Sequence, residues 1–510
     1  MGNSKIMRLF FPLIAWSLLT TCSAAASGES TIVFPRILES RGDDGTKVLR
    51  INDELVLNLE PSSVFSDVFM VHTFHDGISH KSYHDAKEFH AELYQDPRQM
   101  ASVMVTETDY VQVEGVLGSR LRIRPAPELE RSLEGHVAHI MFSVEEKTHS
   151  EHGDYASPQE DLYPEPVIAE RSDFHGKTMY PEVHVVVQYD HAKAFGFNKT
   201  AITRYFAIFL NVVNLRYKSM NNPKVQIRIV GLTINKRKED EPYVVRDPTY
   251  KLLMDTGLTM NGLMEQFRKY DFFLQVDIVF FVTALDMIIG EGPTRTVGVS
   301  GYAFCGSACT QYKFGESEDT PLSYDGTHLF AHEVAHTLGC VHDEDPPDQW
   351  VSSSHPGAQS CPWKDGYIMS YVFNDTNHYK FSPCCMEQMR HVFSLPTRKC
   401  LHEKNWRKPE IERTTMLPSM NAKKFCKIMH GWKYPKAYPD PYYDTSACKL
   451  QCVAPRPKRR LGDKIFTHYA IDGSSCDADD NKKVCVNGRC LNKSKWFQYI
   501  NTVIAMTPER

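Results

Sequence analysis

Apolar residues follow two different spacings in the first 400 residues of the chain. Between residues 27 and 145 the runs are short or alternate with polar residues, which predicts a β-rich N-terminal domain. From residue 181 onward, short apolar runs alternate with a repeat of helical spacing. The predicted strands cover residues 183–187, 225–232, 277–283 and 297–303, and the predicted amphipathic helix covers residues 200–217. Strands that alternate with helices predict an α/β domain.

Two further segments differ from these domains in composition. Residues 145–165 are polar and acidic, which predicts an exposed linker. After Cys400, proline, lysine and tyrosine become frequent and six cysteines fall between residues 426 and 490. A small disulfide-supported domain is therefore predicted at the C-terminal end.

The N-terminus has the order of features that a secretory signal peptide requires. Lys5 and Arg8 precede an apolar run over residues 9–19, and Ala24 and Ala26 provide a small-x-small cleavage site. No later stretch approaches ~18 uninterrupted apolar residues, so no membrane span is expected. The formal net charge of −5 gives no reason to expect nucleic acid as a partner. We therefore expect a secreted, extracellular protein.

Cysteine usage agrees with secretion. Of fourteen cysteines, Cys22 would leave with the signal peptide, and the other thirteen fall between Cys305 and Cys490. This distribution predicts disulfides in the second half of the chain, with one thiol left free or paired outside it. Three N-x-S/T tripeptides are candidate glycosylation sites, at Asn198, Asn374 and Asn492.

One motif carries the chemistry. His332 and His336 are four residues apart, so a helix places both imidazoles on one face, where they can bind one metal ion. Gly339 can end that helix in a left-handed conformation, which lets the chain turn and return His342 as a third ligand. Three histidines leave the fourth tetrahedral position open, as a catalytic zinc site requires.

Glu333 lies beside these ligands and is predicted to act as the general base. Zinc lowers the pKa of bound water toward ~7, and Glu333 can take the proton and later deliver it to the leaving amine. A short H-E-x-x-H motif can also be an ordinary solvated helix face. The longer pattern with Gly339 and His342, in a secreted α/β chain, favours the zinc site.

These residues resemble the metzincin metalloproteases. Met369, in GYIMSY at residues 366–371, resembles the Met-turn methionine beneath the zinc, and Asp343 resembles the aspartate that marks the reprolysin (adamalysin) branch. The segment FSPC at residues 381–384 resembles one that follows the Met-turn in that branch. The cysteine-rich tail is similar to that of ADAMTS proteases, and the domain order is most similar to secreted salivary metalloproteases of ticks.

The resemblance implies four parts and a function. The parts are a signal peptide, a β-rich prodomain with its acidic linker, a reprolysin-like catalytic domain of the α/β (α+β metzincin) class with a mixed twisted sheet and a zinc helix, and a cysteine-rich domain, at residues 1–26, 27–177, 178–405 and 406–510. The implied function is a secreted zinc endopeptidase that hydrolyses extracellular proteins such as fibrinogen or matrix components. The alternative is a secreted binding protein that acts through its cysteine-rich domain. In that domain a basic run at residues 456–460 offers contacts to matrix or sulfated glycans, or is a solvated loop.

Three positions depart from the family pattern. The N-terminal region has no cysteine to occupy the zinc, so a propeptide must act through another contact or serve as a folding aid. Tyr371 stands where reprolysins carry proline, and it either donates to the oxyanion or only packs beneath the site. Cys340 lies inside the zinc motif and either is a free thiol or pairs with Cys385.

The family also implies disulfides and a calcium site. The disulfides are Cys361–Cys384 and a bond from Cys400 to either Cys305 or Cys309. The calcium ligands would be oxygen atoms of Glu182, Asp277, Cys400 and Glu403. The strand at residues 297–303 is expected to bind an extended substrate by strand addition, with Gly298 and Gly301 allowing close approach.

Overall fold

The structure is a computed structural model of the 510-residue chain. It describes residues 30–40, 44–75, 78–148, 153–158, 174–290, 295–373, 376–404, 406, 422–431, 433–456, 462–471, 473–477, 482–486 and 488–494. The predicted signal peptide, the sequon at Asn374 and most of the basic run at residues 456–460 lie outside these residues.

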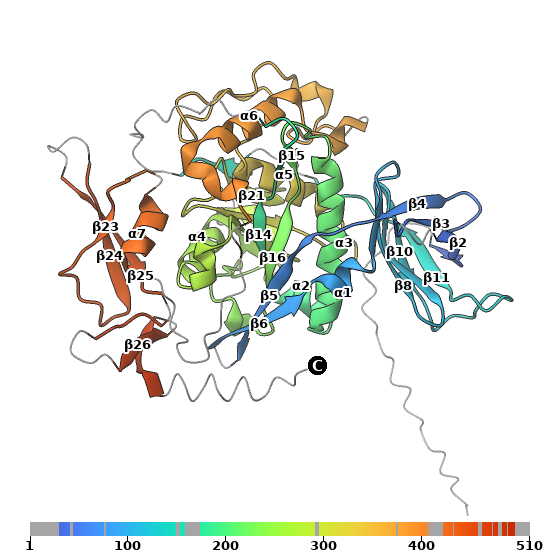
Figure 1. Ribbon diagram of the computed structural model, residues 1–510, viewed down its shortest axis with the longest axis horizontal. Coiled ribbons are helices and arrows are strands. Elements are labelled where there is room, and N and C mark those ends of the chain that lie inside the picture. Colours follow the sequence, from blue (N-terminus) through green and yellow to red (C-terminus); the bar gives the residue numbers. More distant parts are fainter. Residues whose placement is uncertain are drawn as a thin grey trace, which may run out of the picture.

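The N-terminal region forms a nine-stranded antiparallel sheet, as the alternating pattern predicted (Figure 1). Its strands in spatial order are β1 (Thr31–Val33), β11 (His139–Ser143), β10 (Leu121–Pro125), β9 (Val111–Leu117), β8 (Ala101–Glu107), β7 (Leu93–Asp96), β4 (Val56–Pro61), β3 (Lys47–Arg50) and β2 (Arg36–Ser40). Leu57 and Leu59 alternate with exposed neighbours in β4 and bury their side chains in one apolar cluster with Val103 and Val113. Strand β4 thus buries one face, whereas β7 and most of β8 are buried on both faces.

A second sheet of eight strands lies at the centre of the molecule (Figure 1). Its strands in spatial order are β12 (Tyr155–Ala156), β21 (Gly301–Phe304), β22 (Phe314–Glu318), β18 (Ile278–Thr283), β14 (Glu182–Val187), β16 (Arg228–Ile234), β5 (Phe65–His75) and β6 (Ile78–Asp85). The strands from β22 to β5 run parallel to their neighbours, whereas β21 is antiparallel to β22. Strands β14 and β18 are buried at every position, which accounts for the apolar run of β18, whereas β14 also buries the polar side chains of Glu182 and His184.

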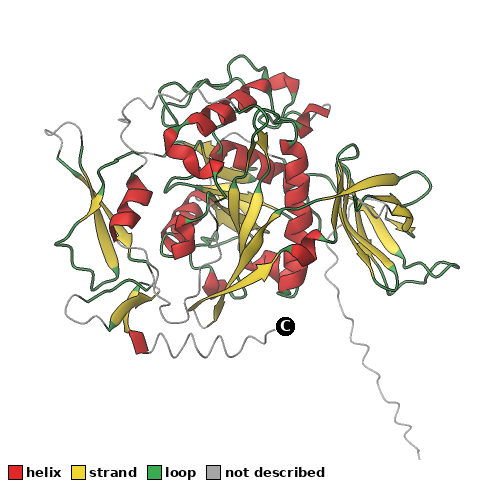
Figure 2. Ribbon diagram, in the orientation of Figure 1, coloured by secondary structure: helices red, strands yellow, loops and turns green. Residues whose placement is uncertain are grey.

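Helices cover this sheet on both sides (Figure 2). They are α1 (Lys87–His90), α2 (Tyr189–Ala194), α3 (Lys199–Tyr217), α4 (Thr256–Phe267), α5 (Thr327–Thr337) and α6 (Pro383–Ser394). The predicted helix at residues 200–217 is α3, and the side chain of Asn198 caps its N-terminus by accepting from the amide of Ala201. Helix α3 contacts α5 on one side and strands β8 and β9 on the other, so it lies between the two large sheets.

The N-terminal region also contributes strands to the central sheet. Strand β5 pairs in parallel with β16, β6 continues that edge, and β12 occupies the opposite edge. The expectation of an exposed linker over residues 145–165 is wrong for Asp154, whose side chain is fully buried. Arg122, also buried, donates to the carbonyl of Ser323, so the regions before and after residue 178 are packed together.

Smaller elements complete the fold. They are the pair β13 (Thr178–Met179) and β15 (Lys224–Val225), the sheet of β17 (Leu253–Asp255), β19 (Asp286–Ile289) and β20 (Thr296–Val297), and the tail elements α7 (Ala422–His430), β23 (Tyr438–Pro439), β24 (Lys449–Ala454), β25 (Lys464–Tyr469), β26 (Lys483–Val486) and β27 (Arg489–Asn492). The six tail cysteines form three disulfides, namely Cys426–Cys452, Cys448–Cys485 and Cys476–Cys490. Within the described residues, no helix combines the length and apolar character needed to cross a membrane.

Candidate active site

Helix α5 carries the first part of the predicted metal site. His332, Glu333 and His336 are completely buried on this helix, which packs against β21 and β22. The helix stops just before Gly339, whose φ of 106° is in the left-handed half of backbone space, as predicted. A Cβ atom at Gly339 would lie 2.3 Å from Cγ2 of Val392, so only a residue without a side chain fits at this turn. Past this turn, His342 returns to the two helical histidines.

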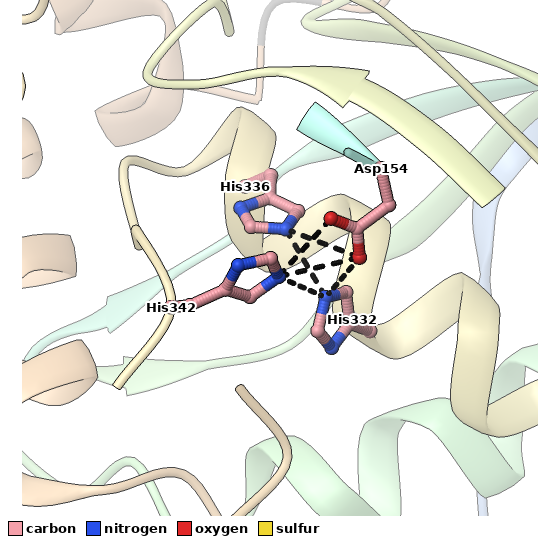
Figure 3. Close-up of side chains that lie close together, drawn as sticks. All are labelled: Asp154, His332, His336 and His342. Atoms are coloured by element: carbon pink, nitrogen blue, oxygen red, sulfur yellow. Dashed lines mark hydrogen bonds and ion pairs between the residues drawn. The ribbon is translucent and has the colours of Figure 1, made fainter. Parts of the chain in front are cut away.

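The three histidine side chains converge on one point, as Figure 3 shows. Nε2 of His332 lies 3.1 Å from Nε2 of His336 and 3.2 Å from Nε2 of His342. Three nitrogens bound tetrahedrally to one zinc ion at 2.0–2.1 Å would lie about 3.3 Å apart. The spacing in the protein therefore fits zinc.

The opposite ring nitrogens explain how the imidazoles are oriented. Nδ1 of His332 lies 2.7 Å from the carbonyl oxygen of Ile368, and Nδ1 of His336 lies 2.7 Å from the carbonyl oxygen of Cys340. A carbonyl only accepts, so each Nδ1 carries a proton, and Nε2 is the nitrogen of each ring that can bind a metal ion at the common point.

His342 has an acidic environment instead. Its Nδ1 lies 3.6 Å from Oδ2 of Asp345, and its Nε2 lies 3.2 Å from the carboxylate of Asp154. Burial lowers the pKa of His342, but these two carboxylates outweigh burial and raise it to about 9. The site thus favours a positive charge beside His342, which a bound divalent cation would supply.

The side chain of Glu333 extends from α5 to β21, the strand next to the edge strand β12. A Cβ atom at Gly301 of β21 would lie 2.4 Å from Oε1 of Glu333, so the carboxylate lies directly against the glycine backbone. Burial raises the pKa of Glu333 well above its usual value, and the nearby carboxylates of Asp154 and Glu316 raise it further. A carboxyl group with a raised pKa can both accept and return a proton near neutral pH.

The segments that follow the helix support the ligands. Met369 is completely buried, and its carbonyl oxygen accepts from the amide of Asp343 at 3.0 Å. Oδ1 of Asp343 accepts from Ser382, 2.6 Å away, which ties the residue after the third histidine to the start of α6. The preceding residue of the predicted Met-turn, Ile368, supplies the carbonyl that orients His332.

Tyr371 reaches the site from the same turn. Its hydroxyl lies 3.3 Å from Nε2 of His342, and its ring packs edge-on against Trp363 with centroids 4.9 Å apart. Burial raises the pKa of Tyr371, and the carboxylates of Asp154 and Glu333 act in the same direction. The hydroxyl therefore keeps its proton and can serve as a hydrogen-bond donor.

Asp154 is the residue at this site that the sequence did not predict. Its Oδ2 lies 3.0 Å from Nε2 of His332 and 4.0 Å from Nε2 of His336, and Oδ1 lies 3.2 Å from Nε2 of His342 (Figure 3). Together with the three histidines it forms a buried group that could hold a metal ion. No spacing rule connects an aspartate with histidines almost 180 residues later. The available signals were indirect, namely the acidic linker and the absence of an N-terminal cysteine.

The disulfides settle the alternatives that the sequence left open. Cys361 pairs with Cys384 as expected, Cys309 rather than Cys305 pairs with Cys400, and Cys340 pairs with Cys385. The last bond joins the end of the zinc motif to α6. Among the described cysteines, Cys305 alone has no disulfide partner, and it is buried.

Of the residues suggested for calcium, Asp277 is in contact with Glu182 and lies close to Cys400. Oδ2 of Asp277 accepts from the amide of Glu182, and Oε2 of Glu182 accepts from the amide of Trp406. Asp277 also lies beside the Cys309–Cys400 disulfide and raises the pKa of the buried Lys313, against the larger lowering by burial. A lysine ammonium here would compete with a cation, and calcium binding stays a prediction.

Three convergent histidines, an adjacent buried glutamate and a methionine turn are the arrangement of a metallopeptidase site. The sequence comparisons agree with this class. Residues 181–382 match the metallopeptidase family M12, in its reprolysin form. The chain belongs to this family, so the family predicted from the motifs is confirmed.

Three arthropod proteins illustrate the similarity. An antarease-like venom metalloproteinase of the scorpion Tityus fasciolatus is 30% identical over 232 residues, which is 44% of this chain and 95% of that protein. The venom metalloproteinase antarease of Tityus serrulatus is 26% identical over 396 residues, covering 76% of this chain and 96% of the relative. An ADAMTS-like protein of Bombyx mori is 26% identical over 435 residues, covering 79% of this chain but only 57% of that longer protein.

Proposed function

We propose that this metallopeptidase is a secreted zinc endopeptidase that cleaves extracellular proteins, with fibrinogen and matrix proteins as candidate substrates. The observation that carries the proposal is the convergence of three Nε2 atoms beside Glu333 and next to β21, which becomes the edge of the sheet once β12 leaves it. A metal ion, a proton acceptor and a peptide-binding edge are the parts that peptide hydrolysis needs.

Each residue of the site has a defined task in this mechanism. His332, His336 and His342 would hold the zinc, which polarises the scissile carbonyl and acidifies the attacking water when it is bound. Glu333 accepts the proton of that water and returns it to the leaving amine, a role that its raised pKa supports. Tyr371 either donates its hydroxyl to the developing oxyanion or only packs beneath the site, and its position 3.3 Å from Nε2 of His342 favours the donor role.

The outer edge of β21 is the proposed substrate site. The amides of Ala303 and Cys305 point outward and already bind an extended segment of the chain, through the carbonyls of Asp154 and Ala156. Main-chain pairing of this kind is independent of side chains, so it suits a protease that accepts many sequences. A substrate at this edge would lie next to Glu333.

Secretion is supported by the composition of the chain and by its disulfides. Six disulfides occur among the described residues, and such bonds persist in oxidising compartments. The cysteine-rich domain would then meet matrix or sulfated glycans. A protein that acts only by binding through this domain is the second candidate, and loss of substrate cleavage on addition of a chelator separates the two.

The decisive test is the substitution Glu333→Ala. We expect hydrolysis of gelatin and fibrinogen to fall at least a thousandfold, while zinc content measured by mass spectrometry stays at one ion per chain. Glu387→Ala, which removes an exposed carboxylate on α6, is the matched control and should keep full activity. All proteins are assayed before and after limited proteolysis. Full hydrolysis by the Glu333→Ala protein would refute the mechanism.

A further inference from the structure

We propose that Asp154 is the fourth ligand of the catalytic metal in the uncleaved protein, and that residues 154–157 form a strap that keeps the enzyme latent. This inference rests on the proposed function, because it assigns a regulator to the same zinc site. Three histidines leave one position of a tetrahedral zinc for water, and catalysis requires that position. A carboxylate there closes the site.

The first argument is the position of the carboxylate. Its two oxygens lie 3.0 Å from Nε2 of His332 and 3.2 Å from Nε2 of His342, on the side of the cluster that the histidines leave open (Figure 3). The four ligand atoms lie within 4.8 Å of one another, and all four residues are buried. An aspartate with no role beyond an ordinary ion pair would not need three imidazoles around it.

The second argument is the way in which the strap binds β21. Strand β12 pairs in parallel with β21, with Tyr155 opposite Ala303. The amide of Ala303 donates to the carbonyl oxygen of Asp154 at 3.0 Å, and the amide of Cys305 donates to the carbonyl oxygen of Ala156 at 3.1 Å. The strap therefore uses the main-chain donors that a substrate would need.

This geometry also explains why the strap is not itself a good substrate. The carbonyl oxygen of Asp154 is engaged by β21, whereas its side-chain carboxylate faces the three histidines. The metal would meet a carboxylate and no scissile peptide carbonyl. A segment bound in this way blocks the site without presenting a bond for Glu333 to act on.

The third argument is that neighbouring side chains fix the strap in place. The ring of Tyr155 stacks on His336 with centroids 4.4 Å apart, and its hydroxyl donates to Asp345 at 2.7 Å. The hydroxyl of Ser157 donates to Asp348 at 2.5 Å. Tyr155 and Ser157 thus each bind a carboxylate that follows the zinc motif in the sequence.

The chain just before the strap is anchored as well. Arg216, which is buried on α3, forms an ion pair with Glu146 at 2.5 Å, and Lys147 forms one with Glu318 at 2.7 Å. The amide of Lys147 also donates to the carbonyl of Asp325. Because these anchors lie upstream of Asp154, cleavage of the chain after Ser157 frees the downstream end of the strap. Water can then replace the carboxylate.

The test measures metal ligation directly and does not depend on activity. The full-length chain is prepared with Glu333→Ala, which prevents self-cleavage, and is loaded with Co²⁺ in place of zinc. Three forms are compared, with Asp154 intact, with Asp154→Asn and with Asp154→Ala. The Ser157→Ala form is the matched control, because it removes a strap contact and keeps the carboxylate.

We expect the visible cobalt spectrum to be independent of pH between 6 and 9 when Asp154 is present, including in the Ser157→Ala control. In the Asp154→Ala form, water occupies the fourth position and ionises near pH 7, so the spectrum should titrate in this range. Extraction of the metal by a chelator should be at least tenfold faster in this form. Asp154→Asn should resemble Asp154→Ala, because a neutral amide is a weaker ligand.

The outcomes separate this inference from the proposed function. If all forms bind cobalt and show the same spectrum and extraction rate, Asp154 is not a ligand, although the zinc site stands. If no form binds cobalt with the expected stoichiometry of one, the proposed function itself fails. With Glu333 intact, uncleaved Asp154→Ala protein should hydrolyse a peptide substrate that the uncleaved parent leaves intact, and equal latency of the two would overturn the role of the strap.

Discussion

Oε1 of Glu333 lies 2.4 Å from the position that a Cβ atom would take at Gly301. Strand β21 and the predicted general base are therefore in contact through the smallest possible residue. We predict that Gly301→Ala displaces the Glu333 carboxylate and lowers kcat by roughly a hundredfold, since a shift of about 1 Å has such an effect in other active sites.

Steady-state kinetics of the processed enzyme and its zinc content test this prediction. The control is Gly257→Ala in α4, where the nearest atom to an added Cβ is 3.8 Å away. Unchanged kcat in Gly301→Ala protein with full zinc content would show that the carboxylate tolerates the displacement.

Tyr371→Phe decides between the two roles of the tyrosine. If the hydroxyl stabilises the oxyanion, its removal lowers kcat by about ten- to a hundredfold with little change in KM, because the contact forms in the transition state. If the ring only packs beside Trp363, the phenylalanine ring preserves the packing and both constants stay unchanged. Comparison of kcat and KM for one peptide substrate is sufficient.

The sequence was most informative where contacts are local. The spacing of His332 and His336 and the glycine turn before His342 determine the ligand geometry within eleven residues, and the structure agrees. The pairing of β5 with β16 and the contact of Asp154 with the histidines join segments separated by more than 150 residues. Such pairings depend on which edges the complete fold leaves open, and local periodicity carries no information about that.

Cys305 should be the single free thiol of the mature protein. Burial raises its pKa well above the usual value, and nearby aspartates raise it further, so it should be unreactive in the native state. Titration with a thiol reagent should give no reaction under native conditions and one thiol per chain in denaturant. Cys305→Ser should reduce the number of thiols found in denaturant to zero. Two or more thiols in the parent would contradict the six disulfides.

The last prediction concerns two buried histidines in the cysteine-rich tail. Nε2 of His430 lies 2.7 Å from Nε2 of His468, an arrangement in which one neutral ring donates and the other accepts. Burial lowers the pKa of His430 to about 2 and that of His468 to about 3. The unfolded chain takes up protons at these residues below about pH 6.5, whereas the folded tail does not. Stability of the tail should therefore be complete above pH 6.5 and fall as the pH decreases.

The free energy of unfolding of the tail should decrease by up to about 1.4 kcal/mol per pH unit for each histidine, between pH 6.5 and the lowered pKa values. Hydrogen exchange of peptides covering α7, β24 and β25, corrected for the intrinsic rate, measures this free energy at pH 7 and at pH 5. The ring of His430 stacks on that of Phe466 with centroids 3.9 Å apart. His430→Phe keeps a ring in this place but removes one proton-binding site. The variant should show roughly half the acid sensitivity of the parent. If the parent protein shows equal protection from hydrogen exchange at pH 7 and pH 5, the pKa values of this histidine pair are not lowered in the folded tail.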